Sequence, residues 1–345
     1  MSALLTSYTL NDTLTLKNRI VMAPMTRSLS GEGLVPTEQM AEYYAKRAST
    51  GLIVTEGTII RPDAQGIIDV PGIWNQEQIQ AWKKVTDRVH EEGGKIFTQI
   101  WHMGRLSHSH FHNERVLAPS AIAYEGNVPR SRELSYEQPD ALSIDEIAQL
   151  VTDFKQAALN AMEAGFDGVE IHGANGYLLD QFLHHETNQR EDEFGGSIEN
   201  MTRFPLQVLD AVGEAIGFDR TAIRVSPGGY LHLTGQAEDR GVFDHLLKEI
   251  EKRDVAYLHL GIFDDSMEFD YLGGKASTYL RENYSKTLIG CGSYDQASAE
   301  QAIENAQFDL MGIGRPLIAN PDYAGNIRLN KQQQDYDSSM LESLI

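Results

Sequence analysis

Three side chains that could act on a carbonyl group follow one short apolar run. The run spans 168–172, and His172, Asn175 and Tyr177 lie within six residues of one another. Histidine and asparagine can both donate a hydrogen bond to one oxygen, which polarises a carbonyl group or binds a phenolate. The phenol of Tyr177 is a neutral acid that can protonate a substrate carbon as it becomes basic. The alternative is that these are packed side chains whose hydrogen bonds are satisfied inside the protein.

Two glycine-rich turns near the end of the chain indicate a site for an anion. They read Gly290-Cys291-Gly292-Ser293 and Gly312-Ile313-Gly314-Arg315. Glycine lets backbone N–H groups approach a phosphate closely, and arginine adds a charge and several donors. Neither turn completes the Gly-x-Gly-x-x-Gly motif that opens a dinucleotide-binding unit. The alternative is that these glycines only turn the chain from a strand into a helix.

Two polar side chains interrupt apolar runs, Gln99 in the third run and Arg224 in the fifth. A buried charge without a partner costs about several kcal/mol, so Arg224 must face either a ligand or a carboxylate. Two donors at one barrel mouth would suit the polar edge of a flat heterocycle. The alternative for Arg224 is an internal ion pair with Glu170.

The elements that must position these residues are short apolar runs separated by helical patterns. The runs span 19–24, 51–60, 95–101, 168–172, 222–226, 255–260, 286–290 and 308–314. Such runs are typical of strands that are buried on both faces of a parallel sheet. The helical patterns span 37–49, 76–92, 143–164, 199–216, 241–252, 275–283 and 297–306, and Ser143 with Glu146 forms a capping box. Eight alternations predict an α/β protein with a closed (β/α)8 TIM barrel, whose active site lies where the strands end.

Two excursions interrupt the alternation. Residues 7–18 alternate between polar and apolar, which predicts a hairpin that caps the bottom of the barrel before the first strand. Residues 102–142 form a long loop after the third strand, on the face where active sites of barrels lie. We expect residues 1–330 to form a single domain and 331–345 to form a short tail.

The charge balance excludes several kinds of partner. The chain has 345 residues, with 29 basic and 50 acidic side chains and a net charge of −21. A surface this negative repels phosphate backbones and anionic lipids, so nucleic acid and membranes are poor partners. The single cysteine, Cys291, suits a reducing compartment. Because we find neither a secretory signal nor an apolar run long enough for a membrane span, we expect a cytoplasmic protein.

Three segments carry a specific family resemblance. They are Ala-Pro-Met-Thr-Arg at 23–27, Glu-Ile-His-Gly-Ala-Asn-Gly-Tyr-Leu-Leu-Asp-Gln-Phe-Leu at 170–183, and Asn-Gln-Arg-Glu-Asp-Glu-Phe-Gly-Gly-Ser at 188–197. With them, the sequence resembles the Old Yellow Enzyme family of FMN-dependent ene-reductases, which includes N-ethylmaleimide reductases. The resemblance extends from about residue 5 to residue 330. It implies a barrel that binds FMN tightly and without a covalent bond.

The resemblance also implies a set of site residues and no metal. FMN would contact Pro24, Met25, Thr26, Gly57, Gln99, Arg224, Gly292, Ser293, Gly314 and Arg315. The substrate would contact Thr26, Ile67, Trp101, His172, Asn175 and Tyr177. In this scheme His172 and Asn175 hold the substrate carbonyl and Tyr177 delivers a proton.

The implied reaction is a two-step reduction at one shared pocket. NADPH or NADH gives a hydride to the flavin and leaves, and an α,β-unsaturated carbonyl compound then takes the hydride at its β-carbon. Tyr177 protonates the α-carbon from the other side, and the shared pocket implies ping-pong kinetics. The expected substrates are enones, maleimides, quinones or nitro compounds, and the expected assembly is a monomer or a homodimer.

The chain departs from the family pattern at two places near the pocket. Ile67 stands where many relatives carry a tyrosine, and the tail 331–345 lacks the aromatic residues with which many relatives reach the substrate. The resemblance therefore predicts a pocket that is more open or more aliphatic.

Three other functions stay open at this point. The same flavin site could serve mainly for nitro, nitrate-ester or quinone reduction, which does not need the proton of Tyr177. A catalytically weak flavin-binding protein would share the cofactor site. The alternative from a different class is a metal-dependent barrel hydrolase, with ligands from His108, His110 and His112 or from the run His184-His185-Glu186.

Overall fold

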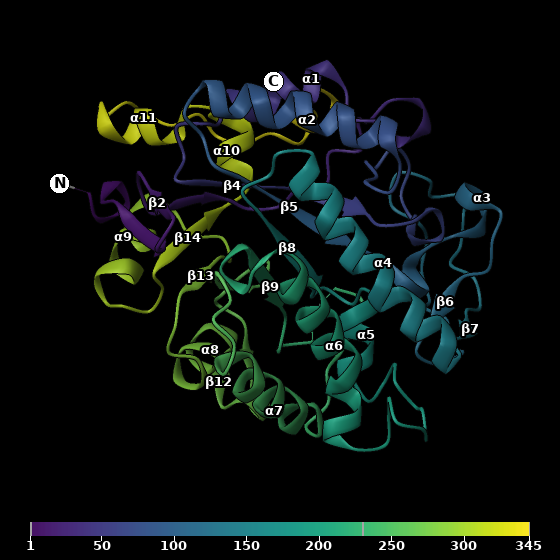
Figure 1. Cartoon of the computed structure of the whole chain (residues 1–345). Coiled ribbons are helices and arrows are strands. Elements are labelled where there is room, and N and C mark those ends of the chain that lie inside the picture. Colours follow the sequence, from purple (N-terminus) through teal and green to yellow (C-terminus); the bar gives the residue numbers. More distant parts are fainter. Residues whose placement is uncertain (1, 230, 345) are drawn as a thin grey trace.

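Eight parallel strands close into a barrel that is surrounded by helices (Figure 1). The computed structural model describes residues 2–229 and 231–344. Around the barrel the strand order is β10-β13-β14-β3-β4-β5-β8-β9. The bounds are β3 Ile20–Met22, β4 Leu52–Ile59, β5 Ile96–Trp101, β8 Gly168–Gly173, β9 Thr221–Val225, β10 Leu258–Leu260, β13 Leu288–Gly290 and β14 Leu310–Ile313. Every residue of these strands is buried, and the predicted (β/α)8 barrel is confirmed.

The helices predicted from the sequence are present. They are α1 Glu38–Ala45, α2 Gln76–Glu91, α4 Ile144–Glu163, α6 Ile198–Ile216, α7 Asp239–Glu251, α8 Ala276–Asn283 and α9 Gln296–Glu304. Helix α4 begins with the predicted capping box, because the side chains of Ser143 and Glu146 each accept a hydrogen bond from the other residue's backbone N–H. Gly165 follows the helix with φ = 85°, a left-handed conformation that favours glycine.

The sequence patterns missed the short helices. They are α3 Ser109–His112, α5 Leu178–Leu183, α10 Arg315–Ala319 and α11 Tyr323–Arg328. All six residues of α5 are buried, Asp180 and Gln181 included, so this helix has no exposed face to which an amphipathic pattern could correspond. Strand β8 and helix α5 flank the short segment that holds Asn175 and Tyr177.

The predicted hairpin closes the amino-terminal end of the barrel. Strands β1 (Tyr8–Asn11) and β2 (Leu14–Leu16) pair in antiparallel fashion. Leu10, Leu14 and Leu16 pack in one cluster with side chains from the first residues of the barrel strands, including Val21 and Leu52. The hairpin therefore covers the core at the amino-terminal end of the barrel, and the carboxyl-terminal end stays open for a site.

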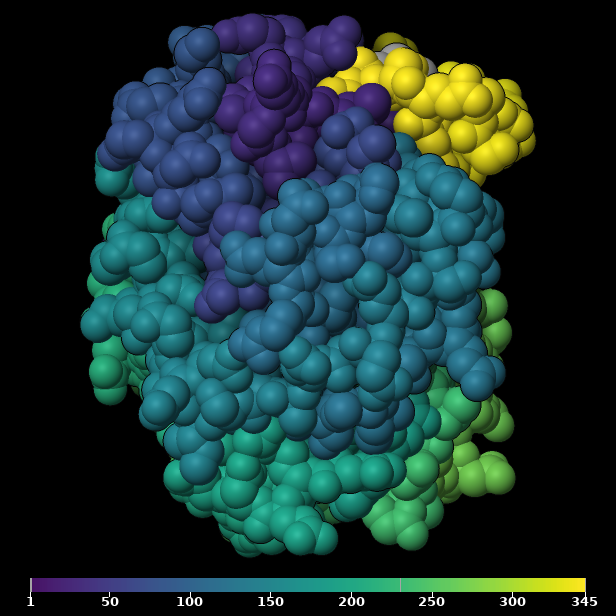
Figure 2. Space-filling model, turned by 90° about the vertical axis from the view of Figure 1, so that its right-hand side faces the viewer, coloured from purple at the N-terminus to yellow at the C-terminus, as the bar shows by residue number. Residues whose placement is uncertain are grey.

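The excursion after β5 and the tail both lie beside the barrel mouth. Within 102–142, strands β6 (Leu117–Ala118) and β7 (Asp140–Ala141) pair with each other. Figure 2 shows the yellow carboxyl-terminal segment lying against the purple amino-terminal part of the chain. None of the helices in the described part of the chain is long and apolar enough to cross a membrane.

Candidate active site

Three rings gather where β5 and β8 end. The indole of Trp101, the last residue of β5, stacks on the imidazole of His172 with ring centroids 5.7 Å apart. The phenol ring of Tyr177 packs edge-on against both, at 4.6 Å from Trp101 and 4.9 Å from His172. Adjacent strands of the barrel, β5 and β8, bring these side chains together. We call these three residues the ring cluster.

His172 is a neutral imidazole inside this cluster. Burial lowers its pKa well below the usual value for histidine, and the nearby charges of Arg224 and His259 lower it further. Its Nδ1 atom is buried and has no hydrogen-bond partner among the described residues. A buried polar atom without a partner is costly, so this nitrogen is a strong candidate for contact with a ligand.

A cavity of about 540 Å³ opens beside the ring cluster at the carboxyl ends of the strands. Its lining includes eight of the residues predicted to bind cofactor or substrate: Pro24, Met25, Asn175, Arg224, Gly292, Ser293, Gly314 and Arg315. Ile262, Phe263, Cys291 and Leu231 also line it, and the sequence had not indicated them as site residues. The volume lies in the range of small-molecule and cofactor sites, so the cavity is large enough for a flavin nucleotide.

The two glycine-rich turns differ in what requires glycine. A Cβ atom on Gly292 would lie 2.6 Å from the backbone nitrogen of Asp265, and its φ is 124°, so glycine is required by the fold itself. A Cβ on Gly314 would meet only the Sδ atom of Met25, at 3.5 Å. Packing therefore leaves room for a side chain at Gly314, and that side chain would fill part of the cavity. The open space beside Gly314 fits a bound phosphate group.

Aromatic rings hold Arg315 at the rim of the cavity. Its guanidinium lies 4.6 Å from the ring centre of Phe263 and 5.5 Å from that of Tyr336. Such cation–π contacts orient a guanidinium without neutralising it. The charge of Arg315 is thus available to an anion, and the tail supplies one of the two rings.

The polar side chains inside the barrel form a buried network. The Nε2 atom of Gln99 donates to Oε1 of Glu170 at 2.7 Å, and Oε2 of Glu170 lies 2.8 Å from Nδ1 of His259. Arg224 contacts the carbonyl of Leu260 and the Sγ atom of Cys291. Arg224 lines the cavity, and Gln99 is buried in this network.

The thiol of Cys291 is a feature that sequence reasoning missed. Burial raises its pKa, but hydrogen bonding to His259 and the charge of Arg224 outweigh burial and lower the pKa to about 7. The sequence showed only a lone cysteine, because the contact with His259 and Arg224 depends on the alignment of three barrel strands.

Four further predicted residues, Thr26, Gly57, Ile67 and Gln99, do not line the cavity, and neither do the three residues of the ring cluster. A Cβ on Gly57 would lie 2.2 Å from Cε3 of Trp101, so glycine is required there by the indole. Ile67 is buried in one apolar cluster with Trp101, and Tyr177 packs against that cluster. Thr26 is half-buried in the segment that follows β3.

Arg27, next to Thr26, is held from two sides. Its backbone N–H donates to Oε2 of Glu56, whose pKa is raised to about 6 by burial. Its guanidinium donates to the carbonyls of Met340 and Ser343 in the tail. The tail therefore packs beside the segment that forms one wall of the cavity.

The histidine-rich runs do not form a metal centre. Across the described ranges, no group of three or more histidine, cysteine, aspartate or glutamate side chains is arranged to hold a metal ion. His108 contacts the carbonyl of Ser135, and the rings of His184 and His185 both contact Asp239.

Comparisons with known proteins agree with this geometry. Residues 4–334 match the model of the NADH:flavin oxidoreductase / NADH oxidase family. The chain is 38% identical over 332 residues to 12-oxophytodienoate reductase 2 of Arabidopsis thaliana, covering 94% of this chain and 88% of that protein. It is 39% identical over 317 residues to a probable flavin mononucleotide-dependent alkene reductase of Leishmania infantum, covering 89% and 85%.

Solved structures show the same likeness. The old yellow enzyme homologue from Zymomonas mobilis superposes with a TM-score of 0.92 at 37% identity, covering 98% of this chain and 96% of that one. Morphinone reductase in complex with tetrahydroNAD superposes with a TM-score of 0.90 at 39% identity, covering 99% and 94%.

Proposed function

The chain belongs to the NADH:flavin oxidoreductase / NADH oxidase family, and we propose that it reduces the C=C bond of α,β-unsaturated carbonyl compounds. It is an oxidoreductase of the Old Yellow Enzyme type that uses FMN with NADPH or NADH. Because this is a family of oxidoreductases, we set aside the hypothesis of a metal-dependent hydrolase that the sequence left open. The observation that carries the proposal is the neutral His172, with its unpartnered Nδ1, which packs against Tyr177 and pairs across adjacent strands with Arg224 of the cavity lining.

The cavity lining supports a specific assignment of the residues that hold FMN. We assign the phosphate to Gly292, Ser293, Gly314 and Arg315, and the ring edge to Pro24, Met25, Thr26 and Arg224. Gly57, beside Trp101, and Gln99, bonded to Glu170, are assigned to the same cofactor from the family pattern. When bound, FMN supplies the hydride chemistry, which no protein side chain can provide.

His172 and Asn175 bind and polarise the substrate oxygen in this proposal. A neutral imidazole can donate one hydrogen bond without bringing a full charge into the pocket, and the amide of Asn175 is a second donor. Two fixed donors aimed at an oxygen that becomes negative stabilise the transition state more than the ground state. Burial, together with the nearby charges of Arg224 and His259, lowers the pKa of His172 and keeps it neutral, which preserves this role.

Tyr177 supplies the proton to the α-carbon. A phenol is protonated at neutral pH, so it is ready as an acid. Its edge-on packing against Trp101 and His172 fixes the ring, and a fixed donor loses little entropy when the substrate binds. Reduction of nitro groups, nitrate esters or quinones needs no proton on carbon, so a rigidly packed Tyr177 favours enones as substrates.

Steady-state reduction of 2-cyclohexenone and of a nitroaromatic compound by the FMN-loaded enzyme tests the proposal. We expect NAD(P)H oxidation to depend on the enone, with parallel lines in double-reciprocal plots and a saturated ketone as product. Flavin reduction by NAD(P)H without any turnover of enone would contradict the proposal, and turnover restricted to the nitro compound would favour the alternative reaction.

A further inference from the structure

The segment that carries Asn175 and Tyr177 has an unusual backbone. Asn175 has φ = 62° and Gly176 has φ = 78°, so two successive residues adopt the left-handed conformation. Asparagine tolerates this conformation better than most residues, but it still has a cost, which the surrounding structure must offset. The positions of the proposed oxygen donor and proton donor therefore depend on what holds this segment.

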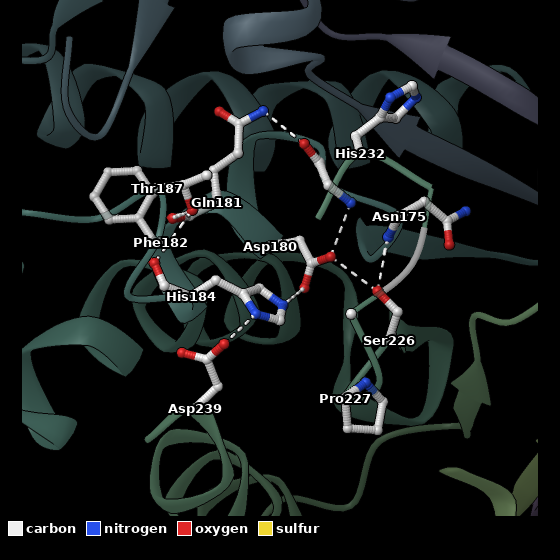
Figure 3. Close-up of polar contacts among 12 residues, drawn as sticks. Asn175, Asp180, Gln181, Phe182, His184, Thr187, Ser226, Pro227, His232 and Asp239 are labelled. Atoms are coloured by element: carbon white, nitrogen blue, oxygen red, sulfur yellow. Dashed lines mark hydrogen bonds and ion pairs between the residues drawn. The ribbon is translucent and has the colours of Figure 1, made fainter. Parts of the chain in front are cut away.

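Hydrogen bonds that converge on Asp180 hold it. The backbone N–H of Gly176 donates to Oδ2 of Asp180 at 2.9 Å, and the hydroxyl of Ser226 donates to the same oxygen at 2.8 Å. The Oγ atom of Ser226 in turn accepts the backbone N–H of Asn175 at 2.8 Å. Figure 3 shows this chain of contacts, in which one carboxylate oxygen serves both left-handed residues.

The other oxygen of Asp180 faces a buried ion triad. Nε2 of His184 lies 3.3 Å from Oδ1 of Asp180, and Nδ1 of His184 lies 2.8 Å from Oδ2 of Asp239 (Figure 3). All three side chains are fully buried. Burial alone would lower the pKa of His184, but the two carboxylates raise it to about 10. The imidazole is therefore a cation between two carboxylates.

We propose that His184 is a positioning residue, which pairs with Asp180 and thereby fixes the segment that carries Asn175 and Tyr177. Removal of one partner from a buried ion pair leaves the other charge without compensation, so the loss of His184 would disturb the hydrogen bonds that Asp180 accepts. Asp239, the first residue of α7, contacts the other side of the His184 ring and so links His184 to that helix. The run His184-His185-Glu186 thus acts through charge and not as a metal site. The inference rests on the proposed function in one respect: the phenol and the enone used to detect the effect are ligands of the proposed site.

His185 provides a matched control. Its Nδ1 atom also contacts Asp239, at 2.7 Å from Oδ1, but its side chain is 37% exposed and contacts Asp239 without an ion pair to Asp180 among the described residues. If His184 only anchored Asp239, then His184→Gln and His185→Gln would have similar effects. If His184 acts through Asp180, only His184→Gln should disturb Asn175 and Tyr177.

The test compares the FMN-loaded variants by titration with p-chlorophenol and by enone turnover. We expect His184→Gln to retain its flavin spectrum. Its Kd for p-chlorophenol, measured from the long-wavelength absorption band that the phenol induces, should rise at least tenfold. Its kcat for the enone should fall at least tenfold. His185→Gln should stay within twofold of the unsubstituted enzyme. Equal losses in both variants, or no loss in His184→Gln, would overturn the proposal.

A second variant covers the case in which His184→Gln does not fold. Ser226→Ala removes one hydroxyl from the same chain of contacts and creates almost no change in volume. We expect it to weaken phenol binding at least threefold, and an unchanged Kd would overturn the proposal. If the unsubstituted enzyme reduces no enone, the proposed function fails, but the phenol titration still decides the role of His184 because it needs no turnover.

Discussion

Two buried histidines on neighbouring elements differ in charge: one is neutral and the other is a cation. His172 at the end of β8 is neutral, because burial and the cations of Arg224 and His259 lower its pKa. His184 after α5 is protonated, because Asp180 and Asp239 raise its pKa to about 10 in spite of complete burial. Burial lowers the pKa of both imidazoles, so the signs of the neighbouring charges decide the outcome.

The same pair also differs in the groups that face its ring nitrogens. Both nitrogens of His184 face carboxylates, Nδ1 through a hydrogen bond with Asp239 and Nε2 as an ion pair 3.3 Å from Asp180, whereas Nδ1 of His172 has no partner among the residues described. We propose that the first histidine holds structure and that the second binds a ligand. Substitutions around each histidine separate these two roles, and the largest effect is expected at Tyr177, which packs against His172.

Removal of the proton donor should have the largest effect. We expect Tyr177→Phe to lower enone turnover by about a hundredfold, because general acid catalysis contributes on that order. The aromatic ring that packs on His172 is retained, so phenol binding and flavin reduction by NAD(P)H should stay within twofold. Stopped-flow measurement of the two half-reactions separates these effects. Unchanged enone rates would remove Tyr177 from the mechanism.

Removal of the neutral donor comes next. We expect His172→Ala to weaken phenol binding about thirtyfold, because a hydrogen bond to a charged oxygen contributes about 2 kcal/mol. Spectral titration of the FMN-loaded variant measures the Kd. Flavin content at the level of the unsubstituted enzyme is the control for folding. A phenol affinity equal to that of the unsubstituted enzyme would show that His172 does not hold the oxygen.

The two histidines should give stability opposite dependences on pH. In the unfolded chain His184 has the ordinary pKa of about 6.5, and in the fold about 10. The folded state therefore binds one more proton between these values, so the stabilising contribution is complete below pH 6.5 and is lost as pH rises to 10. The lowered pKa of His172 has the reverse effect, with stability falling as pH drops below 6.5.

Urea unfolding of FMN-loaded His184→Gln and of the unsubstituted enzyme from pH 6.5 to 9.5 measures this difference. We expect the gap in unfolding free energy to shrink by roughly 1 kcal/mol per pH unit. His185→Gln is the control, and its gap should not change in this way. A gap for His184→Gln that stays constant across this range would mean that His184 is not a cation in the folded protein.

The smallest effect concerns Arg315, a cation held by aromatic rings and not by carboxylates. Loss of one cation–π contact costs about 0.5–1 kcal/mol at an exposed site. We therefore expect Tyr336→Leu to raise the Kd for FMN about threefold, while Tyr336→Phe keeps the contact and the affinity. Fluorescence titration of flavin-free protein measures both. Equal affinities in the two variants would exclude a role for the tail in holding Arg315.

Much of the barrel could be predicted from the sequence, because its strands are short runs that are buried on both faces. The capping box at Ser143 and the hairpin over 7–18 are local patterns, and local patterns survive in the fold. Helix α5 escaped prediction because it is short and buried on all sides, so its polar residues do not mark a face exposed to solvent. The ring cluster was predictable in part, since His172 and Tyr177 lie five residues apart at the end of one strand, and the neighbouring strand brings Trp101 beside them.

The supporting contacts could not be read from the sequence. The run His184-His185-Glu186 resembles a set of metal ligands, and only the fold shows that Asp239, 55 residues further along the chain, faces both rings. Cys291 likewise gains its contacts with Arg224 and His259 through strand alignment. These interactions join residues that are distant along the chain, and a single sequence carries no signal for such pairs.

The most direct test of the central claim is a visible absorption spectrum of the FMN-loaded protein during titration with p-chlorophenol. The claim is that a neutral His172 and Asn175 bind a negative oxygen beside the flavin. We expect a flavin spectrum that gains a broad long-wavelength band, with saturation at a defined Kd. A flavin spectrum that never develops the band would contradict the claim, because the cofactor would be present without the pair of donors over it.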